Sequence, residues 1–217
     1  MSDKLLDKEI RKQVEEVLSN MKDRISVVFF VSEERCEFCE TIEKLLGELT
    51  ELTDKLEVRK ASASGEEARS FEIEMTPAVI PLTAEGNDKG VRFYGIPSGH
   101  EFGTLLKTLV DFSAGATPDI SEKTLKRLDT IKQPVDIKVF VTTSCPYCPK
   151  AVLTAFKFAL ANSNVTASMV EASEFEELSK RFGVSSVPQI VINSSRSFVG
   201  AYPEEQYLDE VMKAVAR

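Results

Sequence analysis

Two short stretches, Cys36-Glu37-Phe38-Cys39 and Cys145-Pro146-Tyr147-Cys148, hold the information that decides the fold of this chain. They contain all four cysteines of its 217 residues, as two C-x-x-C pairs. A disulfide within such a pair closes a very short loop and stabilises a fold little. The pairs therefore point to chemistry rather than to cross-linking, which in a reducing compartment means metal binding or redox exchange.

The same order of predicted elements surrounds each pair, so the chain contains one unit twice. Runs of β-branched and aromatic residues predict strands, and apolar residues spaced by three and four predict helices. In the first unit the predicted strands are 25–31, 56–61, 78–83 and 91–95, and the helices are 42–52, 65–71 and 101–112. In the second unit the strands are 137–141, 165–170, 189–193 and 196–200, and the helices are 152–160, 175–182 and 204–215. Amphipathic segments at 3–20 and 121–131 predict an opening helix for each unit.

An X-Pro dipeptide precedes the third strand of each unit. Thr76-Pro77 lies 41 residues after the first leading cysteine, and Val187-Pro188 lies 43 residues after the second. Proline at the start of a central strand is awkward unless its peptide bond is cis, where it makes a tight bend. With a helix stop near Thr117-Pro118, we expect an N-terminal unit at 1–117 and a C-terminal unit at 118–217.

Charge and hydropathy exclude several classes of function. The net charge of −8 has the wrong sign for a nucleic-acid binder or for a protein that binds anionic membranes. The most apolar stretch, Ile25 to Val31, is too short to cross a bilayer. The first twenty residues form a charged helical pattern rather than a secretory signal. We therefore expect a cytoplasmic protein without nucleic-acid or membrane partners.

The order strand, C-x-x-C, helix, strand, helix, X-Pro, strand, strand, helix is that of the thioredoxin fold. Two such units in one chain resemble the tandem, glutaredoxin-like protein disulfide oxidoreductases, and Pro146-Tyr147 is the dipeptide of glutaredoxins. The resemblance implies an α/β protein in which each unit has a central mixed β-sheet flanked by helices. It also implies reduction, oxidation or isomerisation of protein disulfides, with the cysteine pairs as the only redox group.

The resemblance also suggests partners and leaves alternatives open. A thioredoxin-reductase-like flavoprotein is the expected electron donor. One alternative is an electron-transfer module that reduces a peroxiredoxin, as in the tandem amino-terminal units of alkyl hydroperoxide reductase flavoproteins. Another is a non-catalytic module that binds a metal or a client protein, since paired C-x-x-C motifs also build four-cysteine zinc sites.

Each cysteine has an expected role. Cys36 and Cys145 are predicted nucleophiles, because a position at the start of a helix favours the thiolate through unpaired N–H groups and the helix dipole. Cys39 and Cys148, three residues further on, are predicted to resolve the mixed disulfide. Pro146 and Pro149 suit a first helical turn. By resemblance, Thr76, Pro77, Val187 and Pro188 form the loops that face the cysteines and receive substrate.

The charges beside the two pairs predict that the leading thiols differ in pKa. Around the first pair, Glu33, Glu34, Glu37 and Glu40 surround Arg35, whereas Lys150 is the charge nearest to the second pair. Negative neighbours disfavour a thiolate and a positive neighbour favours it. With Glu37, Pro146, Tyr147 and Lys150 as tuning residues, Cys145 is expected to be the more acidic thiol.

Two features common among the relatives are missing. Thioredoxins carry a buried Asp six residues before the first cysteine, where this chain has Phe30 and Val139. Glutaredoxins hold glutathione with a Gly-Gly turn and an acidic residue, where this chain has Gly200-Ala201-Tyr202-Pro203-Glu204. The resemblance therefore supplies neither a proton acceptor nor a glutathione site.

Overall fold

Each repeat forms a helix followed by the same alternation of strands and helices in the computed structural model, which describes residues 4–32 and 36–216. The first repeat contains α1 (Lys8–Leu18), β1 (Ile25–Val31), α2 (Cys39–Thr50), β2 (Leu56–Ser62), α3 (Glu66–Ser70), β3 (Ala78–Leu82), β4 (Val91–Tyr94) and α4 (His100–Ser113). The second contains α5 (Glu122–Leu128), β5 (Val135–Val141), α6 (Cys148–Ala161), β6 (Val165–Glu171), α7 (Glu176–Arg181), β7 (Gln189–Ile192), β8 (Arg196–Val199) and α8 (Glu204–Val215).

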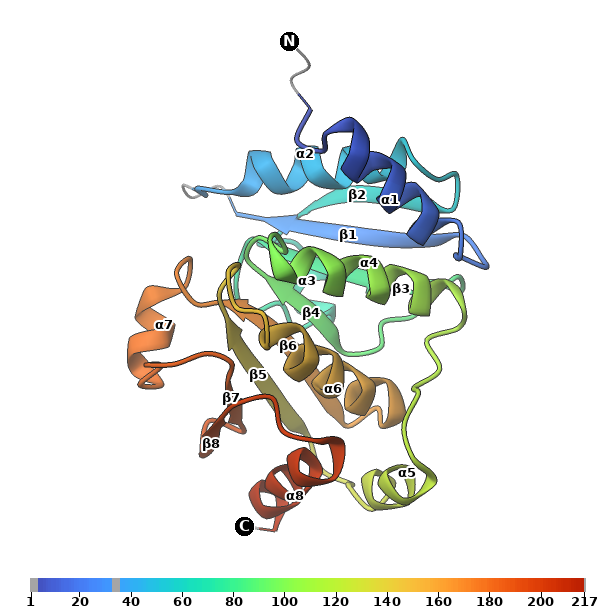
Figure 1. Ribbon diagram of the computed structural model, residues 1–217. Helices are drawn as coiled ribbons and strands as arrows, with labels where there is room; N and C mark the ends of the chain where they lie inside the picture. Colours follow the sequence, from blue (N-terminus) through green and yellow to red (C-terminus); the bar gives the residue numbers. More distant parts are fainter. Residues whose placement is uncertain (1–3, 33–35, 217) are drawn as a thin grey trace.

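All eight strands lie in one continuous sheet, in the order β2-β1-β3-β4-β6-β5-β7-β8 (Figure 1). In each repeat the first strand runs parallel to the second and antiparallel to the third, which in turn pairs antiparallel with the fourth. The repeats join where β4 pairs in parallel with β6, with Tyr94 opposite Val170. The fourth strand of the first repeat thus has no free edge, because the other repeat covers it.

Alternation along the strands produces two apolar layers, one on each face of the sheet. Val27 and Phe29 belong to the larger core, which includes side chains of α1, α2, α4, α6 and α8. Val28 and Phe30, which point the other way, belong to the smaller core that includes Ala68 of α3 and is packed against by Leu178 of α7. Strands β1, β3 and β7 are largely buried on both faces, which explains their nearly continuous apolar sequences, whereas the edge strands β2 and β8 are partly exposed.

A buried lysine links the repeats. Lys138 of β5 is 5% exposed, and its Nζ lies 2.6 Å from Asp136 and 2.8 Å from Glu74, which precedes β3. The pair with Glu74 crosses from the second repeat to the first, so the junction includes a partly buried ion network as well as strand pairing.

The predicted fold class of two tandem thioredoxin-like units is confirmed. The opening helices are shorter than expected from 3–20 and 121–131: α1 starts after Asp7 and α5 after Ser121, whose side chains accept hydrogen bonds from the first turn. In the described ranges, no helix combines the length and the apolar character needed to cross a bilayer.

Candidate active sites

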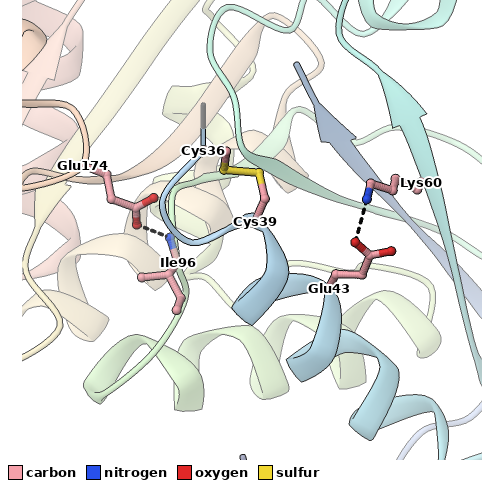
Figure 2. Close-up of a disulfide and its surroundings, with 6 residues drawn as sticks. All are labelled: Cys36, Cys39, Glu43, Lys60, Ile96 and Glu174. Atoms are coloured by element: carbon pink, nitrogen blue, oxygen red, sulfur yellow. Dashed lines mark hydrogen bonds and ion pairs between the residues drawn. A yellow bond between two sulfur atoms is a disulfide. The ribbon is translucent and has the colours of Figure 1, made fainter. Parts of the chain in front are cut away.

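The first cysteine pair lies between the end of β1 and the start of α2. Cys36 and Cys39 form a disulfide with an S–S distance of 2.03 Å and a Cα–Cα distance of 5.5 Å, and both residues are half-buried (Figure 2). An exposed ion pair of 2.6 Å between Glu43 and Lys60 links α2 to the neighbouring strand β2. The pair is oxidised, and part of each cysteine is exposed to solvent, so a partner protein can reach it.

The second pair has the same placement after β5, with a disulfide between Cys145 and Cys148 and a Cα–Cα distance of 5.5 Å. It is more buried than the first: Cys145 is 7% exposed and Cys148 has no exposed surface. A macromolecular partner can therefore approach Cys145 but not Cys148, which fits a leading and a resolving role.

Both helices begin at the second cysteine of their pair and not at the leading cysteine, as the predicted roles assumed. α2 and α6 start at Cys39 and Cys148, so each leading cysteine lies in the turn before the helix rather than in it. In the second repeat the Cys145 N–H donates to the Thr142 carbonyl, which makes this segment a separate turn. Pro149 occupies the first helical turn as predicted, whereas Pro146 lies before the helix.

The helix ends next to the cysteines lack side-chain caps. Phe38 and Tyr147 are the N-cap residues, and neither side chain accepts a hydrogen bond from the first turn. The first-turn N–H groups of α2 and α6 are thus not satisfied by their own caps, unlike those of α1 and α5. Such N–H groups stabilise a nearby thiolate.

Both X-Pro loops lie at the same end of the sheet as the cysteines. The peptide bonds Thr76-Pro77 and Val187-Pro188 are cis. Phe30 pairs with Ala78 and Phe140 pairs with Gln189, so each proline is next to the strand end that leads into its C-x-x-C turn. Pro77 is buried, and Thr76 and Val187 are half-buried.

Matching backbone bonds hold the two loops. The Pro77 carbonyl accepts from the Gly95 N–H at 3.0 Å, and the Pro188 carbonyl accepts from the Gly200 N–H at 2.8 Å. In the described part of the chain, no backbone hydrogen bond is found for the N–H or C=O of Thr76 or Val187. These groups can therefore pair with an incoming strand.

The predicted tuning residues lie at the surface beside the two pairs. Tyr147 is 71% exposed, and Glu37, Pro146 and Lys150 are also exposed. Glu33, Glu34 and Arg35, which contribute to the predicted charge difference between the pairs, lie outside the described residues.

Glu101, a carboxylate in the first turn of α4, was not predicted as a site residue. It is 1% exposed, and neither oxygen has a hydrogen-bond partner. Burial raises the pKa of Glu101 to about 7, and the nearby Thr104 hydroxyl opposes the shift without forming a well-shaped hydrogen bond. A signal was present in the sequence, since Glu101 falls on the apolar face that continues through Leu105 and Leu109.

Glu101 belongs to the first repeat, but its helix start is bound to the second site. The His100 N–H donates to the carbonyl of Thr143, two residues before Cys145, at 3.0 Å. The helix that carries this buried carboxylate is thus anchored on the turn that leads to the second disulfide.

Glu174, also not predicted, follows β6 in the second repeat and lies in the surroundings of the first disulfide (Figure 2). Its Oε1 accepts from the Ile96 N–H at 2.5 Å. Burial is the main cause that raises the pKa of Glu174 to about 7; Glu171 and Glu37 add to the rise, and the Ile96 hydrogen bond opposes it.

A groove runs beside the second pair between α4 and α6. Its volume is about 570 Å³, and Pro146 and Pro149 line it together with Phe112, Leu153 and Lys157. An extended polypeptide bound in this groove would have access to the turn that carries Cys145.

Comparison with known proteins identifies the fold. The family described as "Thioredoxin domain" matches residues 135–213. A crystal structure of a protein disulfide oxidoreductase from Aeropyrum pernix K1 is 30% identical, with a TM-score of 0.87 over 97% of this chain and 94% of that one. The chain belongs to the protein disulfide oxidoreductase family. Its two C-x-x-C pairs lie on tandem thioredoxin units, one pair in each unit.

The chain is also similar to proteins of alkyl hydroperoxide reductase systems. AhpF, an alkylhydroperoxide reductase component of Enterococcus faecalis, matches with a TM-score of 0.85 and 26% identity over 95% of this chain and 99% of that one. The corresponding alkyl hydroperoxide reductase component of Staphylococcus aureus is 23% identical over 87% of this chain, and an NADH dehydrogenase of Bacillus subtilis is 24% identical over 94%. The chain spans 34% and 37% of the length of these two curated relatives.

The four cysteines form two separate pairs. Each pair closes a disulfide within its own repeat. Across residues 4–32 and 36–216, no group of three or more His, Cys, Asp or Glu side chains lies close enough together to hold a metal ion.

Proposed function

We propose that this chain transfers two electrons between protein disulfides and a cellular reductant, in the cytoplasm, through two sites of unequal reactivity. The proposal treats residues 1–117 and 118–217 as the two redox units. Cys36 and Cys145 act as nucleophiles, and Cys39 and Cys148 resolve. The observation that carries it is the placement of each C-x-x-C pair between a strand end and an uncapped helix start, on a fold shared along nearly its full length with a disulfide oxidoreductase.

The reducing cycle starts from the dithiol form. The thiolate of Cys36 or Cys145 attacks one sulfur of a substrate disulfide, forms a mixed disulfide and releases the other substrate sulfur as a thiolate. Cys39 or Cys148 then loses its proton and attacks the leading sulfur, which frees the second substrate thiolate. The substrate gains two electrons, and the enzyme is left with the disulfide present in the structure. Oxidation of a dithiol substrate runs through the same steps in reverse.

Proton transfer at the second site is assigned to Glu101. A resolving thiol must lose its proton to attack, and a carboxylate with a pKa near neutral pH can take that proton and return it. Glu101 is buried, has no hydrogen-bond partner among the described residues and lies in the first turn of a helix whose His100 N–H binds the turn before Cys145, which supports this role.

Substrate docking is assigned to Thr76-Pro77 and Val187-Pro188. The open backbone groups of Thr76 and Val187 at the sheet end can pair with an extended substrate strand, which would place its disulfide over the leading cysteine.

Among the proposed partners, the comparisons favour a peroxiredoxin, and the electron donor is proposed by analogy alone. A thioredoxin-reductase-like flavoprotein would supply the electrons. The likeness to AhpF and its relatives in alkyl hydroperoxide reductases favours a second candidate function, in which the chain passes electrons to a peroxiredoxin. Binding of a metal or a client without catalysis is the remaining alternative.

Reduction of insulin by dithiothreitol tests the proposal. The intact chain should accelerate the reaction, and a variant with all four cysteines replaced by serine should not. At neutral pH the variant Cys36→Ser/Cys39→Ser, which keeps the second pair, should be faster than Cys145→Ser/Cys148→Ser, because Cys145 is expected to be the more acidic thiol.

If the intact chain does not accelerate the reaction, the enzymatic proposal is wrong and a binding module is favoured. Metal analysis of the purified protein would then test for metal binding. Faster turnover by the variant that keeps the first pair would overturn the order of the two sites but not the function.

A further inference from the structure

The first site receives a charged group from the other repeat. Glu174 follows the end of β6, and its carboxylate binds the backbone N–H of Ile96, two residues after the end of β4 (Figure 2). The neighbouring Gly95 N–H binds the carbonyl of Pro77, in the loop that precedes β3. A short stretch of backbone thus joins Glu174 to the proline loop of the first site.

The local structure holds Glu174 in this position. The Glu171 carboxylate, which is 4% exposed, accepts from the N–H groups of Ser173 and Glu174 at 2.9 and 2.8 Å. Gly95 has a φ of +87°, and a Cβ at this position would meet Glu174 Oε1 and Glu171 Cβ below 3 Å. The glycine permits the close approach that places the carboxylate of the second repeat beside the first disulfide.

We propose that Glu174, supplied by the second repeat, is a tuning residue of the Cys36–Cys39 site. Its ionised carboxylate opposes formation of the Cys36 thiolate. The inference rests on the proposed role of Cys36 as the leading thiol. It adds a source of inequality between the sites that the sequence does not reveal, because the residue is distant in the chain and its charge is brought in by packing of the repeats.

Among the described residues, the surroundings of Glu174 contain more negative than positive groups. Glu37, next to Cys36, and Glu171 both act on it electrostatically. The groove that Glu174 lines also includes Glu74, Glu176, Glu177 and Arg181. Glu74 is paired with Lys138, Glu176 and Glu177 are paired with Lys180, and the Arg181 guanidinium lies over the Phe182 ring. In the described residues no cation is paired with Glu174 itself.

Alkylation of Cys36 tests the proposal on the full chain. Cys39→Ser/Cys145→Ser/Cys148→Ser leaves one thiol, and its rate with iodoacetamide is measured from pH 5 to 9. With Glu174 present, the curve should be broader than one proton step, because the two groups titrate against each other. Glu174→Gln should give a single step and raise the rate at pH 7 about threefold or more, while the rates at pH 5.5, where Glu174 is mostly protonated, stay similar.

Matched variants separate charge from structure. Glu174→Gln keeps an oxygen that can accept from Ile96, so the fold should persist, and circular dichroism checks this. Glu174→Asp keeps the charge, so its curve of alkylation rate against pH should lie closer to that of the parent than the curve of Glu174→Gln does. Glu177→Gln, in the same groove but exposed and paired with Lys180, should leave the curve unchanged. Superimposable curves for the parent and Glu174→Gln would overturn the proposal. Because alkylation needs no disulfide exchange, the insulin assay reports separately on the proposed function.

Discussion

Glu101 and Glu174 share one physical property: burial raises the pKa of each carboxyl group to about 7. Removing a carboxylate from water disfavours its charged form, and neither residue has a cationic partner among the described residues to offset this cost. Each comes from the repeat opposite to the site it is proposed to serve. At the scale of single residues, each proposed role therefore uses an acidic group whose pKa lies near neutral pH.

The raised pKa of Glu101 predicts a pH-dependent stability. The unfolded carboxyl ionises near 4.5 and the folded one near 7, so the folded state keeps its proton to higher pH. Stability is therefore lost between about pH 4.5 and 7, by about 3 kcal/mol in total. Glu101→Gln removes this loss and should be more stable than the parent at pH 8 by up to that amount, with a much smaller difference at pH 5.

Urea unfolding at the two pH values measures the effect. Glu16→Gln, an exposed carboxylate on α1, is the control and should change little at either pH. Equal differences between Glu101→Gln and the parent at pH 5 and pH 8 would show that Glu101 is not held in its protonated form.

The start of α4 is the element that connects the first repeat to the second site. Gly99 precedes this helix with a φ of +59° and a ψ of −127°, and an added Cβ would collide with the carbonyl of Thr143. Only glycine combines this backbone conformation with such a close approach. The same contact places the His100 N–H on Thr143, so this single position sets how the helix meets the turn of Cys145.

Gly99→Ala should therefore destabilise the protein by about 2 kcal/mol or more, through backbone strain and displacement of the helix start. It should also slow alkylation of Cys145 more than that of Cys36 in the reduced protein. Gly103→Ala, in the same helix with no atom within 4 Å of the added Cβ, should instead stabilise by about 0.5–1 kcal/mol. Chemical denaturation and mass-spectrometric alkylation give both readouts. A Gly99→Ala protein as stable as the Gly103→Ala protein would contradict this expectation.

The whole molecule is organised by one sheet that passes through both repeats. β4 and β6 each cover an edge of the other repeat, and Lys138 adds an ion network with Asp136 and Glu74 across the junction. Burial raises the pKa of Asp136, and the adjacent Lys138 ammonium opposes that rise. With strand pairing, side-chain packing and charge shared across the boundary, we expect the two repeats to unfold together.

Lys138→Met tests this cooperativity. It leaves the partly buried Asp136 carboxylate without its cation and should cost about 2 kcal/mol at pH 7. In this variant the thiols of both repeats should become exposed at a lower urea concentration than in the parent, and the shift should be the same for both repeats. Lys126→Met, whose side chain is 79% exposed, is the control and should change stability by less than about 0.5 kcal/mol. A shift confined to the second repeat would mean that the units unfold independently.

Much of this protein could be predicted from its sequence, because the decisive signals are local. Strands β1 and β5 are short runs of β-branched and aromatic residues, and the cores they form follow the alternation of the chain. The C-x-x-C spacing and the two X-Pro dipeptides recur in the same order, so the repeat, the fold class and the cysteine pairs could all be recognised. The helices begin at the second rather than the leading cysteine of each pair, and at the second site the preceding turn forms its own backbone bond.

Only the tertiary structure decided how the two repeats complete one another. Glu174 reaches the N–H of Ile96, 78 residues away in the chain, and Glu101 lies on a helix of the first repeat that contacts α6 and binds the turn before Cys145 through the His100 N–H. No local pattern encodes such contacts, because they depend on which strand edges pair and on how closely the helices then pack. Packing of the first repeat against Glu174 removes part of its carboxylate from water, and this burial raises the pKa of Glu174 to about 7.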